Sequence, residues 1–182
     1  IEYSAVGDFE PEAVEKAIKS GLAGWKKAPA YARVGNPYRD IPAKQFDIDT
    51  PDKANAFYVS RMPLKLQDTD ADYASLYLAN YLFGASETSR LWNRVRETEG
   101  LSYNVRSSLS VSSFEPSASW TMYAIYAPQN RERLEKAINE ELARVLKDGF
   151  SEKEISDGIN ALLNLSLIHI SEPTKQEAIS YA

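Results

Sequence analysis

Arg96 and Tyr103 are the residues of this 182-residue chain whose types and spacing best suit the binding of a polar ligand. An arginine presents a planar fork of N–H donors to a carbonyl or a carboxylate, and a tyrosine presents one O–H donor. Together they could hold a peptide carbonyl or stabilise an oxyanion. On residue types alone, a surface arginine and a half-buried tyrosine are the simpler explanation.

The local sequence indicates how these two side chains could meet. A helix is predicted over residues 88–99, with Leu91 and Val95 facing a core, and Gly100 ends it. A strand that alternates polar and apolar residues begins at Tyr103. Because the chain reverses at Gly100, the end of the helix and the start of the strand can meet at one edge of a sheet.

Other catalytic chemistry has little support in the sequence. The chain has no Cys, which excludes disulfides and thiolate metal sites, and its one His, His169, cannot form a two-histidine zinc motif. Neither a glycine-rich phosphate loop nor a G-x-S-x-G elbow is present. The acidic pairs Glu97/Glu99 and Glu140/Glu141 lie on predicted helices, where solvated faces explain them. We therefore expect no metal site in this chain.

The composition is that of an ordinary globular protein, with 43% hydrophobic and 26% charged residues. A net charge of −5 argues against nonspecific nucleic-acid binding. No apolar run approaches the roughly 20 residues that span a bilayer, so we expect no transmembrane segment. The start has neither a Met nor a basic stretch, so we expect no signal peptide and interpret the chain as an internal piece of a longer polypeptide.

The order of predicted elements indicates an α+β fold, an antiparallel sheet with helices packed on one face. The strand over 119–127 is apolar on both faces, so we expect it to be central and covered on both sides. Pro63 is expected to close the strand over 56–62. The other expected strands lie over 2–6 and 103–111. The expected helices lie over 11–22, between a cap at Asp70 and a stop at Gly84, over 88–99 and 131–148, and from a capping box at Ser151 and Glu154 onward.

Three short motifs together resemble the inactive, C-terminal (non-zinc) domain of the M16 zinc metallopeptidases, the insulinase/pitrilysin type. The family pattern is Leu-Gly-Gly, then Ser-Arg-Leu, then Arg-Glu-x-x-Gly-Leu-x-Tyr. Ala85 stands where the family often has Gly, which can alter the loop before the arginine helix. The motifs stand here as Leu82-Phe83-Gly84-Ala85, Ser89-Arg90-Leu91 and Arg96-Glu97-Thr98-Glu99-Gly100-Leu101-Ser102-Tyr103.

The resemblance covers about residues 1–164 and implies a domain organisation within the metallohydrolase-like two-layer sandwich of that family. Residues 1–25 would be the last strand and helix of a preceding M16 domain. Residues 26–49 contain three prolines and a glycine and are predicted to be a linker. Residues 50–164 would form a truncated non-zinc domain on the substrate side.

The resemblance also implies a function, the substrate-binding half of an enzyme that hydrolyses peptides in a closed chamber. Arg96 and Tyr103 would hold the substrate, and Tyr103 would be a catalytic donor to the tetrahedral oxyanion. Zinc would be bound by a partner M16 domain, in the same polypeptide or in another subunit, and not by this chain. The alternative is a non-catalytic scaffold of the same fold. Both the bacterial periplasm and the cytoplasm are compatible with the sequence.

Residues 165–182 do not follow the family pattern. Their sequence resembles the translation of a transposon-end sequencing adapter, and Lys175 is the one departure from its fixed part. We therefore expect this segment to be an artefactual tail outside the fold.

Overall fold

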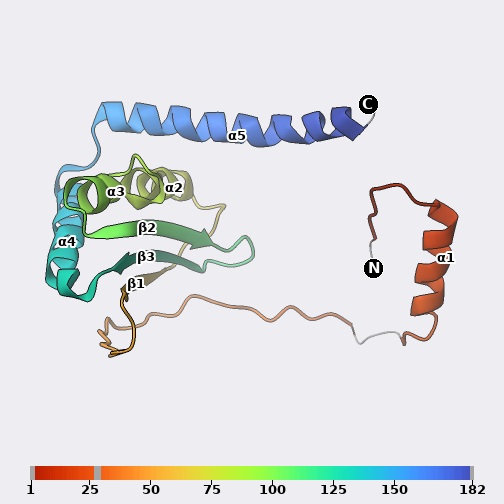
Figure 1. Cartoon of the computed structure of the whole chain (residues 1–182), viewed down its shortest axis with the longest axis horizontal. Helices are drawn as coiled ribbons and strands as arrows, with labels where there is room; N and C mark the ends of the chain where they lie inside the picture. Colours follow the sequence, from red (N-terminus) through yellow and green to blue (C-terminus); the bar gives the residue numbers. More distant parts are fainter. Residues whose placement is uncertain (1–2, 27–29, 181–182) are drawn as a thin grey trace. The chain divides into compact units, whose positions relative to one another are not determined.

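The computed structural model describes residues 3–26 and 30–180, with side chains as far as Ser166. The chain divides into two compact units, residues 1–35 and 36–182. Figure 1 shows helix α1 (Pro11–Leu22) in the first unit and all three described strands in the second. Residues 30–49 form neither helix nor strand.

Among the described residues of the first unit, α1 is the one helix, and the chain before and after it is irregular. Pro11 stands in the first turn of α1, where its missing N–H costs nothing. The strand expected over residues 2–6 is not formed at residues 3–6, and Glu2 lies outside the described residues. A strand needs a neighbour to pair its backbone groups, and the described part of this unit contains no second strand.

The second unit is built on an antiparallel sheet of β1 (Ala56–Leu64), β2 (Ser102–Val111) and β3 (Ala118–Tyr126), in the order β1-β3-β2. The central position predicted for β3 is confirmed. The prediction that Pro63 closes β1 is wrong, because Pro63 pairs with Ser119 and the strand continues to Leu64. An edge strand can accept a proline, since one side of it needs no ladder hydrogen bonds.

The predicted helices form, but two of them change their winding. α2 (Tyr73–Asn80) continues as a π-helical turn, η1 (Tyr81–Ala85), and α3 (Arg90–Trp92) continues as a second one, η2 (Asn93–Thr98). Single π-helical turns inside helices are often found at functional sites. The short η3 (Pro128–Asn130), then α4 (Arg131–Asp148) and α5 (Glu152–Ser180) complete the unit.

The helices bury one face of the sheet, which confirms the predicted α+β fold. Met122 and Ala124 of β3 are buried on that face, whereas Tyr123 and Ile125 on the opposite face are only partly buried. The prediction that both faces of β3 are covered is therefore wrong for the described residues of this unit. The helical side of the core consists of Phe83, Leu91, Trp92, Val95, Leu134, Ala137 and Ile138.

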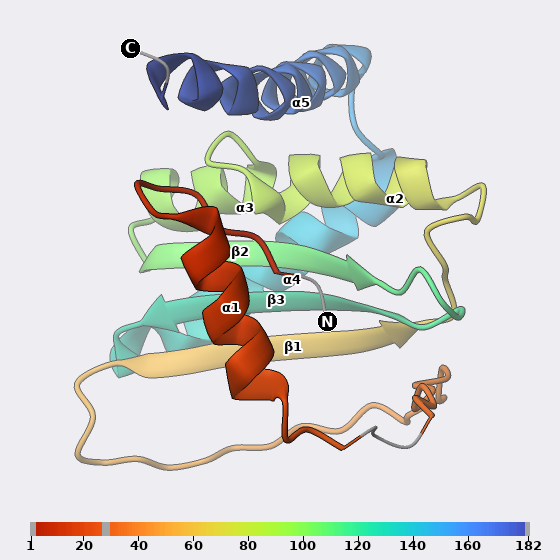
Figure 2. The same ribbon diagram turned by 90° about the vertical axis from the view of Figure 1, so that its right-hand side faces the viewer.

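Helix α5 packs outside the helical layer rather than on the sheet. Figure 2 shows it on the far side of α2 and α3 from the strands. Gly158 lies so close to Leu78 and Leu82 that a Cβ atom there would come within 2.6 Å of the Leu82 side chain. This contact and the turn before α5 hold the start of the helix in place.

Candidate functional site

Arg96 lies in η2 with its side chain 43% exposed. Its guanidinium carbon is 4.3 Å from the centroid of the Trp92 ring, and its Nε is 3.6 Å from the Glu97 carboxylate. The second distance is too long for a hydrogen bond. Arg96 is thus held mainly by an aromatic face of the core residue Trp92, and its own side chain lies outside the core.

Tyr103 is the extra residue of a β-bulge at the start of β2. Ser102 pairs with Tyr126 and Asn104 pairs with Ile125, so Tyr103 has no residue opposite it. The Ser102 hydroxyl donates to the Ile125 carbonyl at 2.6 Å and accepts the Asn104 N–H at 3.2 Å. A bulge changes the direction of the side chain it carries, and Tyr103 is 59% exposed.

The predicted reversal at Gly100 joins the two residues to one end of the sheet. Gly100 has a φ of 59°, a conformation that suits glycine. The Leu101 N–H donates to the Val95 carbonyl at 2.9 Å, which fixes the entry into β2 against the last turn of η2. No hydrogen bond or ring contact joins the side chains of Arg96 and Tyr103, both of which are described.

A second arginine contacts the ring on which Arg96 stacks, and it was not predicted from the sequence. Arg106 of β2 places its guanidinium carbon 5.1 Å from the centroid of the same Trp92 ring. Trp92 is only 6% exposed, and its indole N–H donates to Glu97 at 3.2 Å. The spacing of Trp92 and Arg96, four residues apart on a helix, was a signal that the two side chains could stack.

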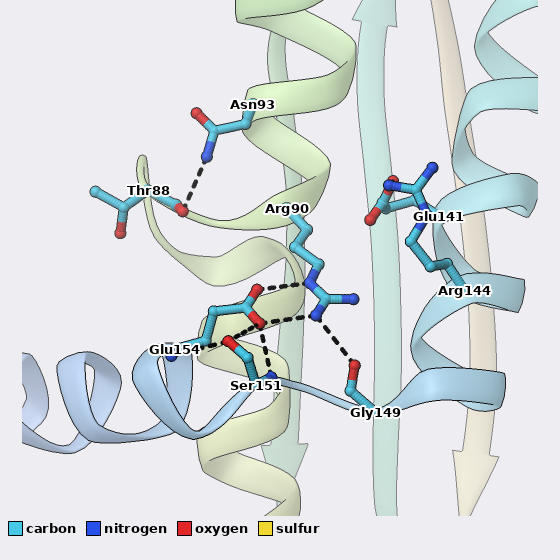
Figure 3. Close-up of polar contacts among 8 residues, drawn as sticks. All are labelled: Thr88, Arg90, Asn93, Glu141, Arg144, Gly149, Ser151 and Glu154. Carbon is cyan, nitrogen blue, oxygen red and sulfur yellow. Dashed lines mark hydrogen bonds and ion pairs between the residues drawn. The ribbon is translucent and has the colours of Figure 1, made fainter.

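The other two arginines of this segment serve the fold. Figure 3 shows Arg90 donating to both carboxylate oxygens of Glu154, at 2.7 and 2.8 Å, and to the Gly149 carbonyl at 3.0 Å. Glu154 also accepts the Ser151 N–H, so the predicted capping box is formed. The bond from Arg90 is the main reason that the pKa of Glu154 is lowered to about 2. Arg94 pairs with Glu99 and Glu140 in the same way.

The described side chains offer no place for a metal ion. Among them, no group of three or more His, Cys, Asp or Glu could hold one. The His169 side chain lies outside that part of the chain. The donor set in the described part of the chain therefore does not fit a zinc ion. None of the helices described there combines the length and the hydropathy that a membrane span needs.

Comparison with protein families matches residues 1–162 to the peptidase M16 inactive domain. The uncharacterized zinc protease YmxG of Bacillus subtilis is 37% identical over 82 residues, 45% of this chain and 20% of that protein. A Helicobacter pylori protein named non-peptidase homolog YmxG is 26% identical over 176 residues, 96% of this chain and 38% of that protein. The chain thus spans well under half the length of these relatives.

Solved structures show the same fold. The crystal structure of a protease from Helicobacter pylori superposes with a TM-score of 0.62 at 18% identity, covering 88% of this chain and 39% of that one. The peptidase M16 inactive domain from Pseudomonas fluorescens gives a TM-score of 0.54 at 23% identity, covering 86% of this chain and 37% of that one. At these identities the likeness concerns the fold alone.

Proposed function

The chain belongs to the peptidase M16 family, in which it matches the inactive domain, and from this we propose that it is the substrate-binding, non-metal half of an M16 zinc metallopeptidase. The observation that carries the proposal is the position of Arg96 and Tyr103. The Arg96 side chain is 43% exposed and Tyr103 is 59% exposed near one end of the sheet, and neither belongs to the core. Hydrogen-bonding side chains that are exposed and not needed for folding are available to a ligand.

The two side chains take different parts in this function. Arg96 presents its guanidinium fork to a carbonyl or a carboxylate of the peptide and so holds the substrate. Tyr103 donates its O–H to the oxyanion of the tetrahedral intermediate, where a positioned donor has its largest effect. The zinc ion belongs to a second M16 domain, in the same polypeptide or in a partner subunit. This division agrees with the name of the Bacillus subtilis relative, an uncharacterized zinc protease.

A non-catalytic scaffold of the same fold is the second candidate. It is favoured by the Helicobacter pylori relative, which aligns with 96% of this chain and is named a non-peptidase homolog. A scaffold would not need an exposed donor pair at one end of the sheet, and this is why we place it second.

The variant Arg96→Lys tests the proposal in the enzyme that contains this domain together with a zinc-bearing domain. Lysine keeps the charge but loses the planar fork, so the KM for a peptide should rise about tenfold or more. Arg144→Lys, at an exposed arginine of α4, is the matched control and should leave KM unchanged. An unchanged KM in Arg96→Lys would contradict the binding role, and no peptide hydrolysis by the zinc-loaded wild type would favour the scaffold.

A further inference from the structure

Trp92 contacts two arginine side chains although it is almost completely buried. The guanidinium carbons of Arg96 and Arg106 lie 4.3 and 5.1 Å from the centroid of its ring. Both distances are within the range of about 6 Å over which an aromatic face attracts a cation. Because a buried ring cannot change its position freely, Trp92 fixes the positions of two positive charges.

The other partners of these arginines are easily replaced. Arg106 donates from Nη1 to the Ala85 carbonyl and from Nη2 to the Glu87 carboxylate, both at 3.2 Å. The side chain of Glu87 is 71% exposed, and that of Glu97, which lies beside Arg96, is 58% exposed. Ion pairs this exposed contribute little to stability, so a carboxylate of a ligand can take the place of Glu87. Glu97 also accepts the Trp92 indole N–H at 3.2 Å, so a ligand would approach Arg96 alongside it.

We propose that Trp92 is a positioning residue that holds Arg96 and Arg106 as a pair, and that this pair binds a carboxylate of the peptide substrate. Guanidinium groups match carboxylates in charge and in planar, two-point geometry. A C-terminal carboxylate and an Asp or Glu side chain offer the same chemistry. The inference rests on the proposed function, since it requires that the peptide lie on the side of the domain that carries Arg96.

The positioning role can be tested without a peptide, by NMR of the arginine Nε–H groups in the full chain. The variant Trp92→Leu should shift the signals of Arg96 and Arg106, because the indole ring current acts on groups above its face. Trp120→Leu is the matched control, since Trp120 packs against Phe83 at 5.4 Å instead. Arginine signals that do not move in Trp92→Leu would overturn the positioning role.

The carboxylate preference is tested with four labelled peptides that otherwise share one sequence. They end in a carboxylate or an amide, and each of these two forms carries either Glu or Gln at one internal position. Wild type should bind one carboxylate form about tenfold more tightly than its neutral counterpart, and the form preferred identifies the source. Arg106→Gln should abolish the preference, as should Trp92→Leu. Trp92→Phe keeps an aromatic face and should retain most of it.

Two outcomes separate this inference from the function on which it rests. Binding of all the peptides with equal affinity would overturn the carboxylate site and leave the proposed function standing. Binding of none of them would overturn both. If Trp92→Leu unfolds, Arg106→Gln still decides the question, because Arg106 lies at the surface of an edge strand and outside the core.

Discussion

Arg90 and Arg96 lie in one helical segment, six residues apart, yet the structure surrounds them differently. Arg90 makes three hydrogen bonds and lies over the Phe150 ring, so three of its five N–H donors are used within the protein. Arg96 has an aromatic face beneath it and a glutamate just beyond hydrogen-bonding distance. The comparison indicates that one arginine joins elements of the fold and that the other is available for binding.

The largest loss of stability is expected from a change in the core, at Leu91, which lies between the two arginines in the sequence. Leu91 is fully buried against the sheet. Leu91→Ala should destabilise the fold by roughly 2–5 kcal/mol, because it removes buried apolar contacts and leaves a cavity. Urea unfolding measures the change. A loss below about 1 kcal/mol would mean that this helix does not anchor the two arginines.

Removing the contacts of Arg90 should destabilise the fold less than Leu91→Ala does, but more than removing the contacts of Arg96. Arg90→Ala leaves the Glu154 carboxylate without its strongest partner and should cost about 1–2 kcal/mol, since both groups are partly screened by solvent. Arg96→Ala should cost less than about 1 kcal/mol, because it removes only an exposed stacking contact. Unfolding of the two variants side by side checks the difference. Equal losses would refute the contrast between the two arginines.

The pair of Arg90 and Glu154 should also give the stability a dependence on pH. The pKa of Glu154 is lowered to about 2 in the folded protein, mainly by the hydrogen bond from Arg90. A lowered pKa stabilises the fold above the ordinary pKa of a glutamate, about 4.3, and this stabilisation is lost as the pH falls toward 2. The advantage of wild type over Glu154→Gln should therefore be constant above about pH 5 and shrink below it. An advantage that does not change with pH would contradict the ion pair.

Removal of residues 165–182 should change the stability of the fold least. Among the residues of α5 whose side chains the structure describes, Glu154 and Gly158, near the start of the helix, contact the rest of the domain. The match to the family ends at residue 162. We therefore expect the shortened chain to melt within about 2 °C of the original. A larger drop in melting temperature would show that the tail belongs to the fold.

The sequence was sufficient to predict the elements that local patterns determine. Alternating residues predicted β2, and the capping box at Ser151 predicted the start of α5 as the structure has it. The sequence was not sufficient where the local structure depends on a strand or helix that is distant in the chain. Pro63 stays in β1 because β1 is an edge strand, and the described segment before α1 forms no strand because the described part of its unit supplies no pairing partner.

In the candidate site, too, the sequence predicted local features but not contacts between distant segments. The positions of Arg96 and Tyr103 relative to Gly100 could be predicted from the helix stop and the strand period. The bulge that displaces Tyr103 depends on its pairing with β3, and the stacking of Arg106 on Trp92 joins a strand to a helix. Neither contact is local in sequence, so no pattern in this segment could have predicted them.

The most direct test of the catalytic part proposed for this domain is the kcat of Tyr103→Phe for peptide hydrolysis, measured in the enzyme with its zinc-bearing domain. The change keeps the ring and removes only the O–H, so the melting temperature should not move. Tyr77→Phe, at another exposed tyrosine, is the matched control. We predict a kcat lowered by on the order of 10²-fold in Tyr103→Phe and unchanged in the control. Full activity in Tyr103→Phe would contradict the donation of the Tyr103 O–H to the oxyanion, and full activity in both Tyr103→Phe and Arg96→Lys would contradict the substrate-side role of the domain.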